Sequence, residues 1–187
     1  MRISLWGGDG GLEVRMRFDQ DRRRWLAIRI MLTILVLQGL VVGLWAVLAP
    51  HSWYTSFPGF GSRWVAVDGP YNQHLAADVG AFFLALAAVS AFALWRPVPA
   101  SVRAAGLGWL VFGLPHLIYH ATHHPHGLGG VGYAISLVGA LALPALGLAC
   151  VLVVPDRAPL PDPAPLRLRL PGRRRDTGRG TANARGR

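Results

Sequence analysis

The sequence predicts an all-α integral membrane protein, in which four helices form an up-down-up-down bundle followed by a disordered basic C-terminal tail. Three observations support this fold class. Hydrophobic residues make up 52% of the 187-residue chain, and they gather in four long blocks. Each block is close to the roughly 20 residues that a helix needs to cross a bilayer. None of the blocks carries the polar face that a helix in a water-soluble bundle requires.

The four blocks are separated by polar links. The first block, residues 30–49, contains no charged residue, and the second, residues 75–95, contains a single aspartate. The third, residues 104–122, ends in histidines, and the fourth, residues 131–154, is again uncharged. Short links between consecutive helices favour antiparallel neighbours. We therefore expect one transmembrane domain over residues 25–155.

Small residues recur inside three of the blocks, and such residues allow two helix backbones to approach closely in lipid. Gly39 and Gly43 form a G-x-x-x-G step in the first block. The same four-residue spacing occurs in the second and fourth blocks, at Ala77, Ala81 and Ala85 and at Gly132, Ser136 and Ala140. We expect these positions to lie at helix–helix contacts.

All nineteen basic residues are arginines, and their distribution predicts the orientation of the chain. Seven lie in residues 1–29, two in the 96–103 link and nine after residue 154. The 50–73 link contains one, and the 120–130 link contains none. Because basic residues concentrate at the cytoplasmic ends of spans, the sequence predicts a multi-pass protein of the cytoplasmic membrane with both termini in the cytoplasm.

The two terminal segments are expected to add little structure. Residues 1–24 form a polar N-terminal segment, and its opening, residues 1–14, has weak structural character. The tail, residues 156–187, is rich in proline and arginine, and its composition predicts disorder and contact with anionic lipid headgroups. Nucleic-acid binding is not expected, since the tail has no aromatic residues among its arginines. The single cysteine, Cys150, excludes an internal disulfide and a cysteine-based zinc site.

The link between the first two blocks is rich in aromatic residues, which are typical of membrane interfaces. It predicts a short interfacial helix or a re-entrant cap over the mouth of the bundle. A lid over a ligand site is the alternative interpretation. The aromatic residues are Trp53, Tyr54, Phe57, Phe60, Trp64 and Tyr71.

Four polar residues lie at matching depths in the second and third blocks. The second block runs from outside to inside and the third runs back, so a rise of about 1.5 Å per residue puts His74 level with His120 and Asp78 level with His116. A spacing of four residues places both members of each pair on one helical face. Ionisable residues within spans usually point into the bundle toward a partner, and His116 is the partner expected for Asp78.

Several functions fit this set of residues. One is a structural Asp78–His116 hydrogen bond between two helices. A second is a divalent or transition-metal site formed by His74, Asp78, His116 and His120, with His123 and His124 at its periphery. A third is haem b, which requires axial histidines on opposite sides, so His74 would have to face the third block. Quinone, lipid and proton-transfer roles stay open.

Two classes of function therefore remain at the level of sequence. One is a non-enzymatic scaffold, accessory subunit or small-ligand binder with an outward-facing His/Asp pocket. The other is a metal- or haem-dependent redox or transport protein. The chain contains no nucleophile elbow, phosphate-binding loop or dinucleotide fingerprint, and its sequence does not decide whether it is an enzyme.

The runs "FPGFG", "YNQHLAADVGAFFLALA" and "GLPHLIYHATHH" resemble small, uncharacterised four-helix membrane proteins of GC-rich bacteria, whose layout is similar to that of DoxX-like proteins. The resemblance covers roughly residues 25–155. Its most specific parts are an N-x-H-x-x-x-D step and a P-H-x-x-x-H step, formed by Asn72, His74 and Asp78 and by Pro115, His116 and His120. The resemblance implies the four-span fold and implies no activity.

Overall fold

A computed structural model describes residues 2–8, 11–17, 21–159 and 166–168. The chain divides into two compact units. One unit comprises residues 21–159 and contains all the helices, and the other combines residues 1–20 with residues 160–187.

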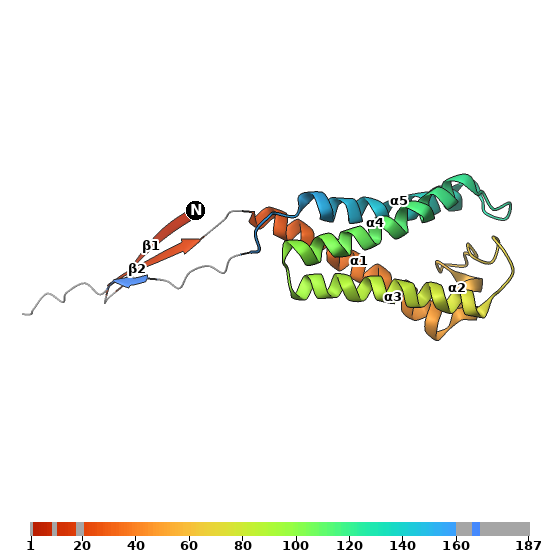
Figure 1. Ribbon diagram of the computed structural model, residues 1–187, viewed down its shortest axis with the longest axis horizontal. Helices are drawn as coiled ribbons and strands as arrows, with labels where there is room; N and C mark the ends of the chain where they lie inside the picture. Colours follow the sequence, from red (N-terminus) through yellow and green to blue (C-terminus); the bar gives the residue numbers. More distant parts are fainter. Residues whose placement is uncertain (1, 9–10, 18–20, 160–165, 169–187) are drawn as a thin grey trace, which may run out of the picture. The chain divides into compact units, whose positions relative to one another are not determined.

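Five helices make up the 21–159 unit (Figure 1). They are α1 (Arg22–Leu48), α2 (Pro50–Ser56), α3 (Gln73–Trp95), α4 (Pro99–Thr122) and α5 (Gly130–Val153). All except α2 are long and apolar enough to cross a membrane. The prediction of four helices that are long and apolar enough to span a membrane is therefore confirmed.

The helix boundaries follow the capping residues. Asn72 caps α3 by accepting a hydrogen bond from the backbone N–H of Leu75. Pro99 begins α4, a position where its missing N–H costs nothing. The α1 helix starts well before its apolar block, at three consecutive arginines, and its 27 residues extend about 40 Å. Since that length exceeds the hydrocarbon thickness, the arginines can lie in water while the apolar part stays in lipid.

The helices pack mainly in two pairs, α1 with α3 and α4 with α5, and Figure 1 shows the helices of each pair side by side. In the first pair a Cβ atom on Gly39 would lie 2.8 Å from the Cβ of Ala87, and one on Gly43 would lie 2.9 Å from the carbonyl oxygen of Gly80. The expected contact at Gly39 and Gly43 is therefore confirmed.

The sequence predicts α4 and α5 as neighbours, but the contacts at Gly106 and Gly113 were not expected. A Cβ atom on Gly106 would lie 2.6 Å from the carbonyl oxygen of Gly147, and Gly113 is equally close to Pro144. These positions let the two backbones touch, which is how small residues join helices in lipid.

The two predicted stripes of small residues have different outcomes. In α5, Ser136 and Ala140 are buried as expected. In α3, Ala81 and Ala85 are exposed, so the prediction is wrong there. The buried face of α3 is instead formed by residues next to the predicted ones in the sequence, which are Ala76, Gly80, Phe83 and Ala87. Many small residues occur in this helix, and their spacing alone does not identify the face that meets α1.

A buried polar contact joins α3 to α4. The indole N–H of Trp109 donates to Ser90 Oγ at 2.8 Å, and Ser90 Oγ donates to the carbonyl of Leu86 at 2.8 Å. Trp109 and Ser90 are both fully buried. Since the Ser90 hydroxyl serves as donor and acceptor at once, neither side chain leaves an unpaired polar hydrogen in the core.

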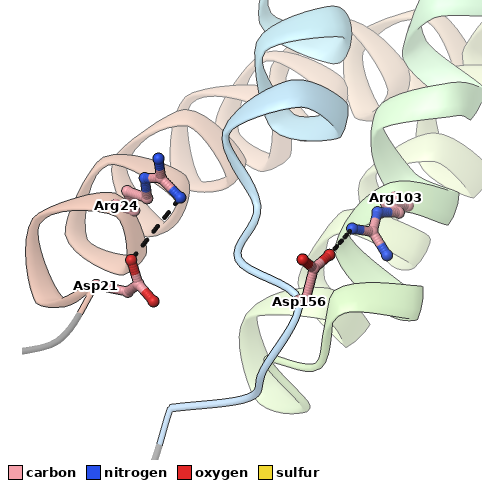
Figure 2. Close-up of polar contacts among 4 residues, drawn as sticks. All are labelled: Asp21, Arg24, Arg103 and Asp156. Atoms are coloured by element: carbon pink, nitrogen blue, oxygen red, sulfur yellow. Dashed lines mark hydrogen bonds and ion pairs between the residues drawn. The ribbon is translucent and has the colours of Figure 1, made fainter.

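Two ion pairs lie at the end of this unit where α1 begins (Figure 2). Arg24 lies 3.8 Å from Asp21, and Arg103 on α4 lies 2.9 Å from Asp156, which follows α5. The Asp156 side chain is 94% exposed, so the second pair contributes little to stability. It does connect the start of α4 to the segment after α5.

The terminal segments contain a small sheet that the sequence analysis did not predict. The strands are β1 (Arg2–Gly8), β2 (Gly11–Arg17) and β3 (Leu166–Leu168), all antiparallel in the order β1-β2-β3. The expectations of weak structure in residues 1–14 and of disorder in the tail are therefore wrong where these three strands form. The other tail residues between 160 and 187 lie outside the described part of the chain.

The sequence contains a signal for β1 and β2. Apolar and polar residues alternate in RISL and in LEVRMR, which is the period of a strand. The glycine-rich run GGDGG separates them, as is common in hairpins. The partner of β2 on its other side, β3, has only three residues, and so short a strand has no detectable pattern of its own.

Candidate functional site

The register between α3 and α4 determines which polar residues lie at the same level. Phe82 and Phe83 of α3 both contact Phe112 of α4, with ring centroids 5.2 and 5.1 Å apart. One turn further along α4 lies His116, and one turn back along α3 lies Asp78. Because the helices are antiparallel, the predicted equal depth of Asp78 and His116 agrees with this register.

The predicted hydrogen bond between Asp78 and His116 is nevertheless wrong. Asp78 Oδ2 lies 3.1 Å from Nε2 of His74 on its own helix. The side chains of His74 and Asp78 are 87% and 62% exposed, so they do not point into the bundle.

The physical reason lies in the direction of the side chains around α3. Val79 packs against the apolar core, together with Phe83. Successive residues of a helix are rotated by about 100°. Asp78 therefore projects well away from the face that Val79 presents to the core, and His74, one turn earlier, shares the direction of Asp78. Equal depth on two helices does not imply that the side chains face each other.

The histidines of α4 lie on a different kind of surface. His116 stacks on Phe112, with centroids 5.3 Å apart, and His120 meets His116 edge-on at 4.6 Å. Phe112 packs against α3 inside the bundle. His116 and His120 follow it at helical spacing, so they lie on the same inner face of α4. Both are half-buried. We refer to His116 and His120 as the imidazole pair.

In the part of the chain that the structure describes, the ring nitrogens of the imidazole pair have no hydrogen-bond partner. Within residues 21–159, neither ring donates or accepts a hydrogen bond. The nearest bond is to the backbone, where Tyr133 of α5 donates to the carbonyl of His120 at 3.0 Å. A half-buried imidazole without a partner needs water or a ligand to satisfy its nitrogens. The pair is thus a polar surface on the inner face of α4 that is open to water or a ligand.

The adjacent face of α4 meets the loop that connects α2 to α3. Tyr119 donates a hydrogen bond to Asp68 Oδ2 at 2.8 Å, and its ring stacks on His123 at 4.4 Å. Tyr119 also lies beside His120, at 6.0 Å between centroids. His124 contacts the ring of Tyr133 instead. His123 and His124 therefore belong to the aromatic surroundings and not to the imidazole pair itself.

The aromatic link forms the short helix that the sequence predicts, α2, and a loop of residues 57–72, which we call the 57–72 loop. Phe57 contacts Trp45, Trp53 and Trp64, and Tyr54 contacts Tyr71. This cluster fixes α2 and the start of the loop to the ends of α1 and α3. Trp64, further along, reaches the start of α5 near Gly132.

No metal site is assembled in the part of the chain that the structure describes, since no three His, Cys, Asp or Glu residues lie close enough to hold an ion. His74 and Asp78 form one exposed pair on α3, and His116 and His120 form a separate pair on α4. The same separation opposes a haem with axial histidines from both helices, because His74 is bonded to Asp78 on an exposed face.

Three residues of this region are not predicted by the sequence. Phe112 lies four residues before His116, and this helical spacing puts it on the same face of α4 as His116 and His120. The spacing was therefore a signal that Phe112 belongs to the site. Asp68 and Tyr119 carried no such signal, because they are 51 residues apart and only the folded loop brings them together.

Comparison with family models, with curated proteins and with solved structures finds no significant match to this chain.

Proposed function

We propose that this protein is a multi-pass component of the cytoplasmic membrane with an up-down-up-down bundle and both termini in the cytoplasm. Four apolar helices, an even number, return the chain to the side on which it starts. The pairing of β2 with β3 supports the placement of both termini on the same side of the membrane. One strand precedes α1 and the other follows α5, and they can pair only if both lie on that side. The arginine-rich ends support the cytoplasmic side.

A labelling experiment tests the orientation. A cysteine at His126, in the turn between α4 and α5, is expected to react with a membrane-impermeant maleimide in intact cells. A cysteine at Ala158, after α5, is expected to react only after the cells are lysed. Both positions are exposed, and Cys150 is buried and gives no background. The reverse pattern would show that the histidines face the cytoplasm.

The imidazole pair supports a non-enzymatic role as a binder of a small ligand at the outward-facing end of the bundle. The observation that carries this proposal is that two half-buried imidazoles on the inner face of α4 have no hydrogen-bond partner in the described chain. Phe112 stacks on His116 and closes the inner end of this surface. A ligand with hydrogen-bonding or metal-binding groups would satisfy the ring nitrogens.

Ligand binding is tested on the full-length protein purified in detergent. Small molecules extracted from the wild type are compared by mass spectrometry with those from a His116→Ala/His120→Ala variant made in the same cells. We expect a compound near one equivalent per chain in the wild type and at least a tenfold loss in the variant. His126→Ala, in the exposed turn, should match the wild type. Identical extracts from all three proteins would contradict the proposal.

A metal-dependent role is the second candidate, and it now rests on the imidazole pair alone. Two histidines four residues apart on a helix are a recurrent zinc-binding arrangement, and imidazole also suits copper and nickel. The test titrates zinc, nickel or copper ions and follows the melting temperature, which rises with ion concentration when the folded state binds the ion. An ion at 100 times its Kd stabilises by about 2.7 kcal/mol. A shift that persists in His116→Ala/His120→Ala would exclude this pair as the ligands.

The remaining expectations fit this proposal. The arginine-rich tail is proposed to contact anionic lipid headgroups, through the attraction of about 1 kcal/mol that each arginine gains near such a surface. The proposed resemblance to DoxX-like four-span proteins implies the same four-span layout and adds no activity.

A further inference from the structure

The 57–72 loop is attached firmly at both of its ends. Phe57 packs on Trp53, and the backbone N–H of Trp64 donates to the carbonyl of Phe57 at 3.0 Å. Near the other end, the hydroxyl of Tyr54 donates to the carbonyl of Gly69. Both attachments are to α2 and its cap, so they hold the loop on the side of the α1–α3 pair.

The middle of the loop crosses to the α4–α5 pair. Asp68 accepts the hydrogen bond from Tyr119. Val67 lies against the turn between α4 and α5, where a Cβ atom on Gly127 would be 3.2 Å from the Cβ of Val67. The loop therefore bridges the two helix pairs at the end that carries the histidines. Within residues 21–159, the Asp68–Tyr119 bond is the only hydrogen bond between the loop and the α4–α5 pair.

The loop also contains a segment suited to rotation. Gly59, Phe60 and Gly61 have φ angles of 107°, 55° and 78°. Nothing lies within 4 Å of a Cβ atom built on either glycine, and Phe60 is fully exposed. Phe60 is held in the left-handed region, which is unfavourable for a residue with a side chain. A segment with few contacts and a strained residue is a natural place for backbone angles to change.

We propose that the 57–72 loop is a lid over the imidazole pair, and that the Asp68–Tyr119 hydrogen bond is its latch. Tyr119 lies directly beside His120 and stacks on His123, so the latch closes against the helix that carries the pair. Opening requires the Asp68–Tyr119 hydrogen bond and the contacts of Val67 at Gly127 and of Trp64 at Gly132 to break, while Tyr54 stays bonded to Gly69. This inference rests on the proposed ligand site, because a lid regulates what enters that site.

The test measures access to the imidazoles without any ligand. Diethylpyrocarbonate modifies accessible histidines, and mass spectrometry gives the rate for His116 and His120 relative to the exposed His126. A Val67→Cys/Gly127→Cys pair, in a Cys150→Ala background, is expected to cross-link under oxidation. The cross-link should lower the relative rate for the pair at least threefold, and reduction should restore it.

Latch variants test the opposite direction. Asp68→Ala and Tyr119→Phe, which remove the acceptor and the donor of the latch, are expected to raise the relative rate at least threefold. Tyr133→Phe is the matched control, since it removes a tyrosine hydroxyl bonded to the His120 carbonyl and does not touch the loop. The lid is overturned if the cysteines do not cross-link, or if modification is equally fast with the loop fixed and free. If the modification rates support the lid but no ligand is found, the proposed ligand binding is excluded and the loop movement stands on its own.

Discussion

Replacing Trp109 with alanine is expected to lower the free energy of unfolding by about 3–5 kcal/mol, the usual cost of removing a tryptophan from a packed core. Trp109 is fully buried where α3, α4 and α5 meet. It contacts Phe83 and Phe112, with centroids 6.0 and 6.5 Å away, and it bonds to Ser90. Denaturation of the detergent-purified protein, followed by circular dichroism, measures the loss.

Two smaller changes separate packing from hydrogen bonding at this position. Trp109→Phe keeps most of the ring volume but loses the N–H donor, while Ser90 can still donate to Leu86. Ser90→Ala leaves the indole N–H buried without an acceptor, at a cost of about 1–3 kcal/mol. A Trp109→Ala variant as stable as the wild type would show that the α3–α4 contact is not formed as described.

Replacing Gly106 with alanine is expected to destabilise the protein by about 1–3 kcal/mol, the range for overpacking a core. The added Cβ atom would lie 2.6 Å from the backbone carbonyl of Gly147. Backbone cannot rotate out of the way as a side chain can, so α4 and α5 would have to separate. The same denaturation experiment gives the magnitude, and the melting temperature should fall with it.

Gly139→Ala is the matched control for Gly106→Ala. Gly139 lies in α5, and nothing is within 4 Å of a Cβ atom at this position. Alanine there should be neutral or stabilising by up to about 1 kcal/mol, because it favours the helix more than glycine does. Equal effects at Gly106 and Gly139 would contradict the close approach of α4 and α5.

The candidate site was predictable in part. The hydropathy of the third block and the spacing of its histidines were sufficient to place His116 and His120 on one face of α4. The positions of Asp78 and His74 along α3 were also correct in depth. The partners expected for these two residues were not correct. The level of a residue along a helix follows from counting residues, whereas the direction of its side chain depends on which residues of α3 pack against the neighbouring helices.

The sequence by itself determined the four apolar helices, the short helix after the first of them and the contact at Gly39 and Gly43. These features follow from local composition, since the energy of placing a segment in lipid depends on its own residues. Only the tertiary structure decided the rest. It turned Asp78 away from His116, brought Gly106 against Gly147, and joined Asp68 to Tyr119 across 51 residues. Each of these outcomes depends on how two distant surfaces fit together, and that fit is not encoded in the spacing of residues along either segment.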